Sequence, residues 1–421
     1  MAPAARVTSF WYEIGLVRNI RLNYAGRMAR KKTRNEEYAG GFPPGMEAFE
    51  NLSDPRDGRA KRHYFGEVLF IALAAMVSGM DDFADFERFA EEREDWLRKW
   101  LKLPNGTPSD DTFRRIFTAL APEAFCDCFI EFTASLSRRL GHELVAIDGK
   151  TLRGSFTAED KSNALHLISA WATASGLTLG QLLVDSKTNE ITAVPKLLRR
   201  IDVKGCVVSL DAMGCQKKIA IAIRHAEADY LLALKGNHGT LHGEVRDLFA
   251  DSAALGSAQA AGNVVARAVS HDKGHGRIEE RHLTVTNHLD WMDARERRSW
   301  LDLRSLVHLR SVRVMADGSR SEEDRYWLTS LEPDAQKLLE LSRGHWGIEN
   351  QCHWVMDVTY GEDASRIRSG HAARNVALLR RLAHNLLKHD QTVKDSIAGK
   401  RKRACLSTAT LEKFLKLSIS K

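Results

Sequence analysis

The chain has 421 residues, of which 43% are hydrophobic and 8% aromatic, so it can bury a large core and is not a disordered polymer. Its 62 Lys and Arg residues outnumber 55 Asp and Glu residues, and the formal net charge of +7 favours a polyanionic partner without identifying one. No apolar run approaches the ~20 residues that span a bilayer, and no secretory leader is recognisable, so we expect a cytoplasmic protein.

The first 45 residues are basic and close on a turn-forming run, Gly40-Gly41-Phe42-Pro43-Pro44-Gly45. We predict that residues 1–45 form a loosely ordered N-terminal extension. Two interpretations stay open for it. It is either a solvated segment, which need not belong to the native protein, or an arm that touches DNA.

Residues 46–140 have the periodicity of a helical domain. Glu67–Ser78 is apolar almost all round, as a helix buried on every side would be. A later helix follows the capping run Thr107–Asp110 and leaves Arg114 and Arg115 on its exposed side. A helix, a turn and a capped basic helix can bind a DNA end as a helix-turn-helix does, but a plain helical bundle has the same pattern.

Residues 144–235 alternate between short apolar strands and helices. The predicted strands cover 144–147, 165–172, 177–184, 206–210 and 230–234, and the predicted helices cover 191–201 and 216–226. Three strands, a helix, a strand, a helix and a strand predict a mixed α/β sheet with helices on its faces, which is the order of a ribonuclease-H-like core.

The pattern changes again at about 240–335, where β-like pieces and polar loops predict a β-rich insertion. Helical periodicity resumes after it and continues to a basic helix near residue 388. We therefore predict an α/β domain over 141–390 that contains the insertion, followed by a basic C-terminal tail over 391–421.

Two acidic residues, Asp148 and Asp211, each end an apolar strand. Open α/β sheets place their chemistry at such strand ends, so the two carboxylates can meet although they are far apart in sequence. Converging carboxylates suit Mg²⁺, and two divalent ions about 4 Å apart are a common means of phosphodiester chemistry. A single Asp in this place is more often a helix cap or turn former, so the interpretation depends on the pair and on a third acid.

Glu349 is the candidate for that third acid. It lies on a predicted helix with His345 and His353 one turn before and after it, so all three share one face. Other acids that follow it closely are Asp357, Glu362 and Asp363. A zinc site made of His345, Glu349 and His353 lacks the H-E-x-x-H spacing, and we disfavour it.

Several segments carry a specific resemblance. They are, in chain order, Val145–Arg153, Ser209–Met213, Lys235–Asn237, His345–Asn350, His353–Trp354, Asp357–Val358 and Glu362–Arg366. With these segments the chain resembles the ISAs-type, or H-repeat-associated, transposases, a group of DDE transposases from bacterial insertion sequences. The stretches Asp54–Leu97 and Pro108–Phe113 are similar to the N-terminal associated domain of that family, so residues 46–140 are expected to bind transposon ends.

The resemblance implies that Asp148, Asp211 and Glu349 are the catalytic acids and the ligands of two Mg²⁺ or Mn²⁺ ions. It also implies metal-dependent cleavage at insertion-sequence ends and strand transfer into target DNA. The implied partners are double-stranded DNA, as transposon ends and as target, and a second copy in a synaptic homodimer. The implied location is the nucleoid of a bacterium.

The wider group often shows Tyr-x2-Arg-x3-Glu-x6-Lys around its glutamate, and only Glu349 of that pattern is present here. The DNA-clamping roles of the Arg and Lys therefore do not carry over. As DNA contacts we predict instead basic and polar residues near the acids and on the capped helix. They are Lys150, Arg153, Lys235, Asn237, Arg343, His345, Arg366, Arg368, Arg114 and Arg115.

Two alternatives stay open. The chain is a metal-dependent nuclease or an inactive element-derived DNA-binding protein, or it is a DNA-binding regulator without catalysis. The regulator leaves the strand-end acids unexplained.

Overall fold

The computed structural model describes residues 46–57, 61–136, 143–155, 164–184, 190–274 and 276–417. The predicted extension over 1–45 lies outside these ranges. No helix within them is long and apolar enough to cross a membrane.

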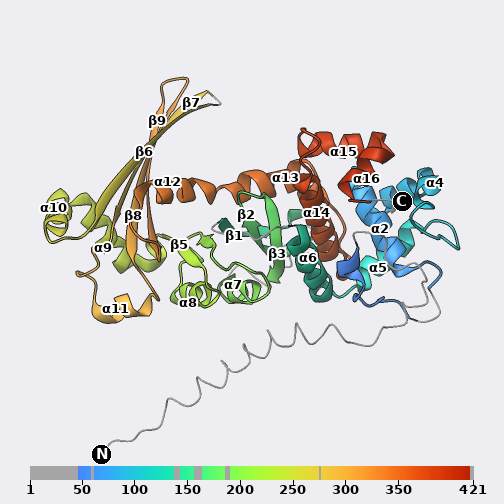
Figure 1. Ribbon diagram of the computed structural model, residues 1–421, viewed down its shortest axis with the longest axis horizontal. Helices are drawn as coiled ribbons and strands as arrows, with labels where there is room; N and C mark the ends of the chain where they lie inside the picture. Colours follow the sequence, from blue (N-terminus) through green and yellow to red (C-terminus); the bar gives the residue numbers. More distant parts are fainter. Residues whose placement is uncertain are drawn as a thin grey trace, which may run out of the picture. The chain divides into compact units, whose positions relative to one another are not determined.

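One mixed sheet of nine strands runs through the described residues, in the order β3-β2-β1-β4-β5-β9-β8-β7-β6 (Figure 1). The strands are β1 (Leu144–Thr151), β2 (His166–Ala172), β3 (Leu177–Val184), β4 (Val207–Leu210), β5 (Asp229–Leu234), β6 (Val265–Gly274), β7 (Arg277–Thr286), β8 (Ser305–Met315) and β9 (Arg320–Thr329). β1, β4 and β5 are parallel neighbours, and β2 is antiparallel to β1 and to β3. Strands β1 to β5 form the ribonuclease-H-like core that the sequence predicts.

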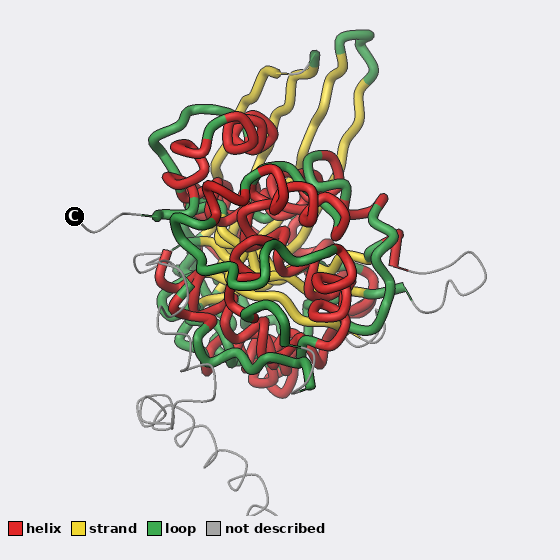
Figure 2. The backbone as a smooth tube through the Cα atoms, turned by 90° about the vertical axis from the view of Figure 1, so that its right-hand side faces the viewer, coloured by secondary structure: helices red, strands yellow, loops and turns green. Residues whose placement is uncertain are grey.

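The β-rich insertion continues the core sheet. Strand β9 pairs antiparallel with β5, and β8, β7 and β6 follow as successive antiparallel neighbours. The far ends of these hairpins project beyond the helices in both views (Figures 1 and 2). The insertion also holds three helices, α9 (Gly239–Ala250), α10 (Ser252–Ala260) and α11 (Ala294–Ser299).

Side chains alternate between the two faces of the sheet, as strand geometry requires. Val145 and Ile147 of β1 belong to the main core, to which α7 (Glu190–Leu198) and α8 (Lys217–His225) contribute. Ala146, between them, packs with Trp171 and Ile348 on the opposite face. The same alternation places Asp148 on the face that carries Ile348.

That second face is covered by a long helical segment. It consists of α12 (Ala335–Gly344), the π-helical turn η8 (Ile348–His353) and α13 (Trp354–Val358). π-Helical turns inside longer helices are rare and frequently occur at functional sites. Glu349 lies within this one.

The helices before β1 pack against helices from the end of the chain. They are η3 (Glu47–Phe49), α2 (Phe65–Val77), α3 (Phe83–Glu92), α4 (Glu94–Leu97), α5 (Asp110–Ala119) and α6 (Pro122–Leu136). Their partners are α14 (Ala372–His389), α15 (Ile397–Leu406) and α16 (Thr408–Phe414). Three short 3-10 turns lie elsewhere in the chain: η4 (Arg153–Ser155), η7 (Gly236–His238) and η9 (Glu362–Ala364). One continuous core joins all of these helices to the sheet.

Part of the predicted basic tail is therefore folded structure. Arg401 of α15 is buried and donates hydrogen bonds to the backbone oxygens of Met76 and Thr359 and to Asp81. Lys400 donates to the Leu387 carbonyl oxygen at 2.7 Å. These charges stabilise the junction of α15 with α2 and α14, which composition alone does not reveal.

Candidate active site

Asp148 and Asp211 lie side by side at one edge of the sheet. Strands β1 and β4 are parallel, and Ile147 is in register with Leu210. The next residue on each strand is therefore an acid, Asp148 on β1 and Asp211 directly after β4. The negative charge of Asp211 contributes to a raised pKa of Asp148, as expected of neighbouring carboxylates.

The helical segment brings Glu349 toward this pair. His353 Nδ1 lies 3.4 Å from Asp148 Oδ2, and His345 Nδ1 lies 2.8 Å from Ser209 Oγ on β4. These two contacts attach the end of the π-helical turn to β1 and the end of α12, just before the turn, to β4. Glu349 lies between the two histidines, and its charge also raises the pKa of Asp148.

Both histidines are held in the neutral form. Burial lowers the pKa of His353 to about 3, and the charges of Arg381 and Lys150 add to this effect. Burial also lowers the pKa of His345 to about 4, against the opposing charge of Asp211. Neutral imidazoles can lie beside Asp148 and hydrogen-bond to Ser209 without placing a fixed positive charge among the acids.

Glu190 is a fourth acid at this edge, and the sequence analysis missed it. It begins α7, its carboxylate contacts His166 Nε2, and its charge is another cause of the raised pKa of Asp148. A Cβ on Gly149 would collide with Glu190 Oε1, so a glycine at this position lets the carboxylate approach the strand. The only sequence signal for it is the glycine directly after Asp148.

The pKa of Asp148 is raised to about 7. Burial is the largest cause, the Gly149 backbone N–H opposes it, and the charges of Asp211, Glu190 and Glu349 add to it. Within the described ranges no three His, Cys, Asp or Glu side chains are gathered closely enough to hold an ion as they stand. The acids nevertheless repel one another, and hard oxygen donors of this kind are the ones that Mg²⁺ and Mn²⁺ prefer.

Lys150 differs from its expected place on the DNA surface. Its side chain is 8% exposed, and its ammonium contacts Asp357, lies 3.5 Å from Glu362 and lies 4.0 Å from Asp363. The alternation of β1 directs Lys150 to the same face as Asp148, where α13 and η9 surround it. Lys150 thus joins β1 to the segment that follows Glu349, and its buried ammonium is not placed to contact DNA.

The other predicted DNA contacts occupy several places. Arg153 is 81% exposed, with Asp363 3.6 Å away, and Arg368 donates to the Gly154 carbonyl oxygen at 2.9 Å. Asn237 donates to the Ala212 carbonyl oxygen at 2.7 Å and so supports the loop after Asp211. Four further predicted contacts are exposed cations, namely Lys235, Arg366, Arg114 and Arg115. The last two lie on α5 and pair there with Asp110 and Asp111.

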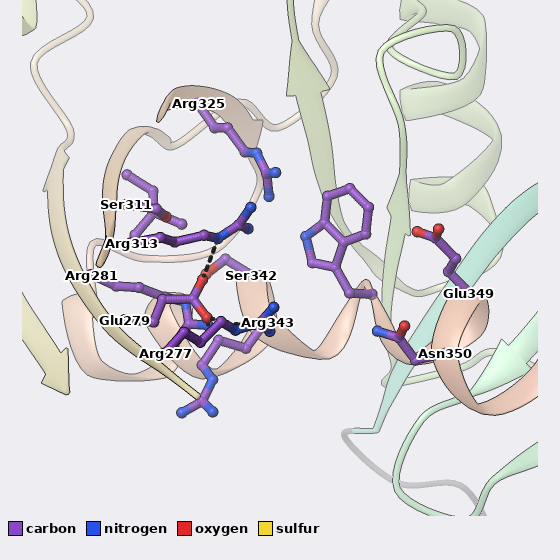
Figure 3. A pocket seen from close by; sticks show the side chains of 12 residues that line it. Arg277, Glu279, Arg281, Ser311, Arg313, Arg325, Ser342, Arg343, Glu349 and Asn350 are labelled. Carbon is purple, nitrogen blue, oxygen red and sulfur yellow. Dashed lines mark hydrogen bonds and ion pairs between the residues drawn. The ribbon is translucent and has the colours of Figure 1, made fainter. Parts of the chain in front are cut away.

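A pocket of about 360 Å³ opens beside Glu349. Its lining includes five arginines, and the predicted contact Arg343 is one of them. Figure 3 shows the arginines gathered on one side, with Glu349 and Asn350 across from them. The remaining arginines are Arg277, Arg281, Arg313 and Arg325, which the sequence analysis did not single out.

The chain is similar in sequence to known proteins. Residues 139–386 match the family model "Transposase DDE domain", and residues 46–133 match "DDE_Tnp_1-associated". The chain is 36% identical over 368 residues to "Putative transposase YncI" of Escherichia coli O157:H7, which covers 86% of this chain and 92% of that protein. It is 33% identical over 374 residues to "H repeat-associated putative transposase YhhI" of Escherichia coli K12, which covers 88% and 97%.

Among solved structures, a piggyBac transposase synaptic complex with hairpin DNA aligns with 88% of this chain and 76% of its own. The TM-score is 0.37 at 11% identity.

Proposed function

This chain belongs to the DDE transposase family, and we propose that it cuts DNA at the ends of its own insertion sequence and joins them to target DNA. The observation that carries the proposal is the register of β1 and β4, which makes Asp148 and Asp211 neighbours, with Glu349 coupled to them through η8. Both reactions are in-line phosphoryl transfers, so one set of carboxylates serves both.

The acids are the ligands of the proposed centre. Asp148, Asp211 and Glu349 would hold two divalent ions, Mg²⁺ or Mn²⁺, which supply when bound the positive charge that stabilises the attacking and leaving oxygens. Burial and the neighbouring negative charges raise the pKa of Asp148, and this supports the role, because a bound cation would favour the ionised carboxylates. His353 and His345 orient the acids and the π-helical turn.

The substrate steps follow from this assignment. In the first, water attacks the phosphorus at the element boundary, and the bond to the 3′ oxygen breaks to leave a free 3′-hydroxyl. In the second, that hydroxyl attacks a phosphodiester of the target, and the displaced target strand leaves with its own 3′-hydroxyl. Double-stranded DNA is thus the proposed substrate of both steps, first as the element end and then as the target. The proposed assembly is a homodimer that holds two element ends.

The test uses a labelled duplex that carries the element's own ends, with a plasmid as target. We expect the wild-type chain to nick the element boundary and to form a joined product with Mg²⁺ or Mn²⁺, and to do neither in EDTA. Asp211→Asn is expected to lose both products and to keep DNA binding. Asp202→Asn is the matched control, since Asp202 is exposed on the loop before β4.

Cation-independent nicking, or equal products from Asp211→Asn and the control, would contradict the proposal.

A further inference from the structure

The pocket beside Glu349 has an unusual concentration of arginine. Arg277 and Arg281 come from β7, Arg313 from β8, Arg325 from β9 and Arg343 from the end of α12. The antiparallel pairing of these strands brings residues that are far apart in sequence to one side of the pocket (Figure 3). The charge therefore results from the fold of the insertion rather than from a basic run in the sequence.

One buried carboxylate arranges three of these side chains. Glu279 is 5% exposed and lies opposite Arg313 in the register of β7 and β8. It accepts from Arg313 Nε at 3.1 Å, lies 2.7 Å from the Arg281 guanidinium and lies 3.9 Å from that of Arg277. A guanidinium fixed in this way loses less freedom when it binds a ligand.

The other two arginines also have acidic partners. Arg343 lies 3.1 Å from Asp272, and Arg325 lies 2.7 Å from Glu323. The Arg325 guanidinium also lies 4.6 Å from the centre of the Trp346 ring, a cation–π contact that occupies the ring. Five guanidinium groups thus pair with three carboxylates, Glu279, Asp272 and Glu323, and positive charge is left over on the pocket side.

Resting on the proposed function, we propose that this pocket binds backbone phosphates of the DNA strand next to the reacting phosphodiester. Arginine forks match phosphate oxygens in pairs, and Glu349 lines the same pocket, so a bound phosphate lies directly beside the catalytic centre. Glu279 is then a positioning residue, which orients three arginines without touching DNA. The contact is to phosphate and is independent of base sequence.

Salt dependence of DNA binding tests this proposal. Each lost phosphate contact lowers the slope of log affinity against log salt by about 0.9. We expect Arg277→Gln and Arg313→Gln each to lower the slope by about that amount and to weaken binding equally on any sequence. Arg313→Lys keeps the charge but loses the fork, and we expect it to recover the slope only in part.

The control is Arg304→Gln. Arg304 is 50% exposed, pairs with the single acid Glu332 and precedes β8 at the end opposite Arg313. Glu279→Gln is expected to lower the affinity for DNA, because the three arginines lose the carboxylate that orients them. If Glu279 acted through its charge alone, its removal would raise the affinity. If the Glu279 variant does not fold, Arg277→Gln still tests the proposal, because the Arg277 side chain is 47% exposed and its replacement should leave the fold intact.

The outcomes separate the two proposals. The pocket proposal is wrong, and the proposed function stands, if the wild type cleaves element ends while the pocket variants and Arg304→Gln have the same salt dependence of DNA binding. If ATP raises the melting temperature of the wild type but not of Arg313→Gln, and the DNA slope is unchanged, the pocket binds a free nucleotide instead and the proposal fails. A wild-type chain that neither binds nor cleaves DNA would overturn both.

Discussion

His353 Nδ1 lies 3.4 Å from Asp148 Oδ2, and this contact attaches the π-helical turn of Glu349 to the strand of Asp148. Burial lowers the pKa of His353 to about 3, so the ring stays neutral and acts through its contact with Asp148. We expect His353→Ala to reduce the cleavage rate by about 10- to 100-fold, as losses of supporting groups around metal ligands do. DNA affinity is expected to stay unchanged. A rate equal to that of the wild type would show that the contact does not position the acids.

Asp148→Asn is expected to stabilise the fold in EDTA at pH 8. The folded pKa of about 7 exceeds the ordinary value of 3.8, so the folded state keeps a proton that the unfolded chain releases between these values. Stability is therefore lost as pH rises through this window, and Asn avoids the loss. We expect a gain on the order of 1 to 2 kcal/mol, since the side chain is 32% exposed and partly screened.

Urea unfolding at pH 8 and at pH 4 measures this effect, and the gain should shrink at pH 4, where the carboxyl is protonated in most molecules. Added Mg²⁺ should then raise the stability of the wild type more than that of the variant, because it binds the folded acids. A variant that is less stable at pH 8 without cation would contradict the assignment.

Acid is expected to destabilise the fold through a buried histidine of α14, His384. Burial lowers its pKa to about 3, and its ring lies 5.6 Å from that of Trp171. Because the folded pKa lies below the ordinary 6.5, the stability of the neutral form is present above pH 6.5 and is lost as pH falls toward 3. His384→Phe keeps an aromatic ring and should reduce the loss between pH 6.5 and 4.5 by roughly 2 kcal/mol. An unchanged pH dependence would exclude His384 as its source.

The buried pair of Glu362 and Arg381 is expected to be sensitive to loss of one partner. Both side chains are 0% exposed, and Arg381 donates to Glu362 at 2.6 Å. The Arg381 and Lys150 charges overcome the effect of burial and lower the pKa of Glu362 to about 2. Glu362→Gln leaves two buried cations short of a partner, and we expect a loss of about 3 to 5 kcal/mol in unfolding free energy. Glu323→Gln, in an exposed pair with Arg325, is the control and should change stability by less than about 1 kcal/mol.

The strand-end acids could be predicted because each follows an apolar run, and because parallel strands end at one edge. Strand β3 has the bounds that the sequence predicts, because an apolar run begins directly after the turn at Ser175 and Gly176. Strand β6 was missed, because its side chains are only half-buried or exposed and carry little periodic signal.

Glu190 and the arginine pocket depend on contacts between distant segments. Glu190 approaches the site through Gly149 and His166, and Glu279 meets Arg313 only in the register of a hairpin. No local pattern encodes either pairing. The sequence predicts Lys150 as a DNA contact for a related reason. It gives the charge of the residue but not its burial against Asp357.

We propose that Glu349, rather than Glu190, completes the centre with Asp148 and Asp211. The most direct measurement is Mg²⁺-dependent nicking of a labelled element-end duplex by Glu349→Gln and Glu190→Gln in parallel, with DNA binding measured for both. We predict that Glu349→Gln binds the duplex and does not nick it, whereas Glu190→Gln still produces the nick. Wild-type nicking by Glu349→Gln, with loss of nicking in Glu190→Gln, would contradict the account and assign the third carboxylate to α7.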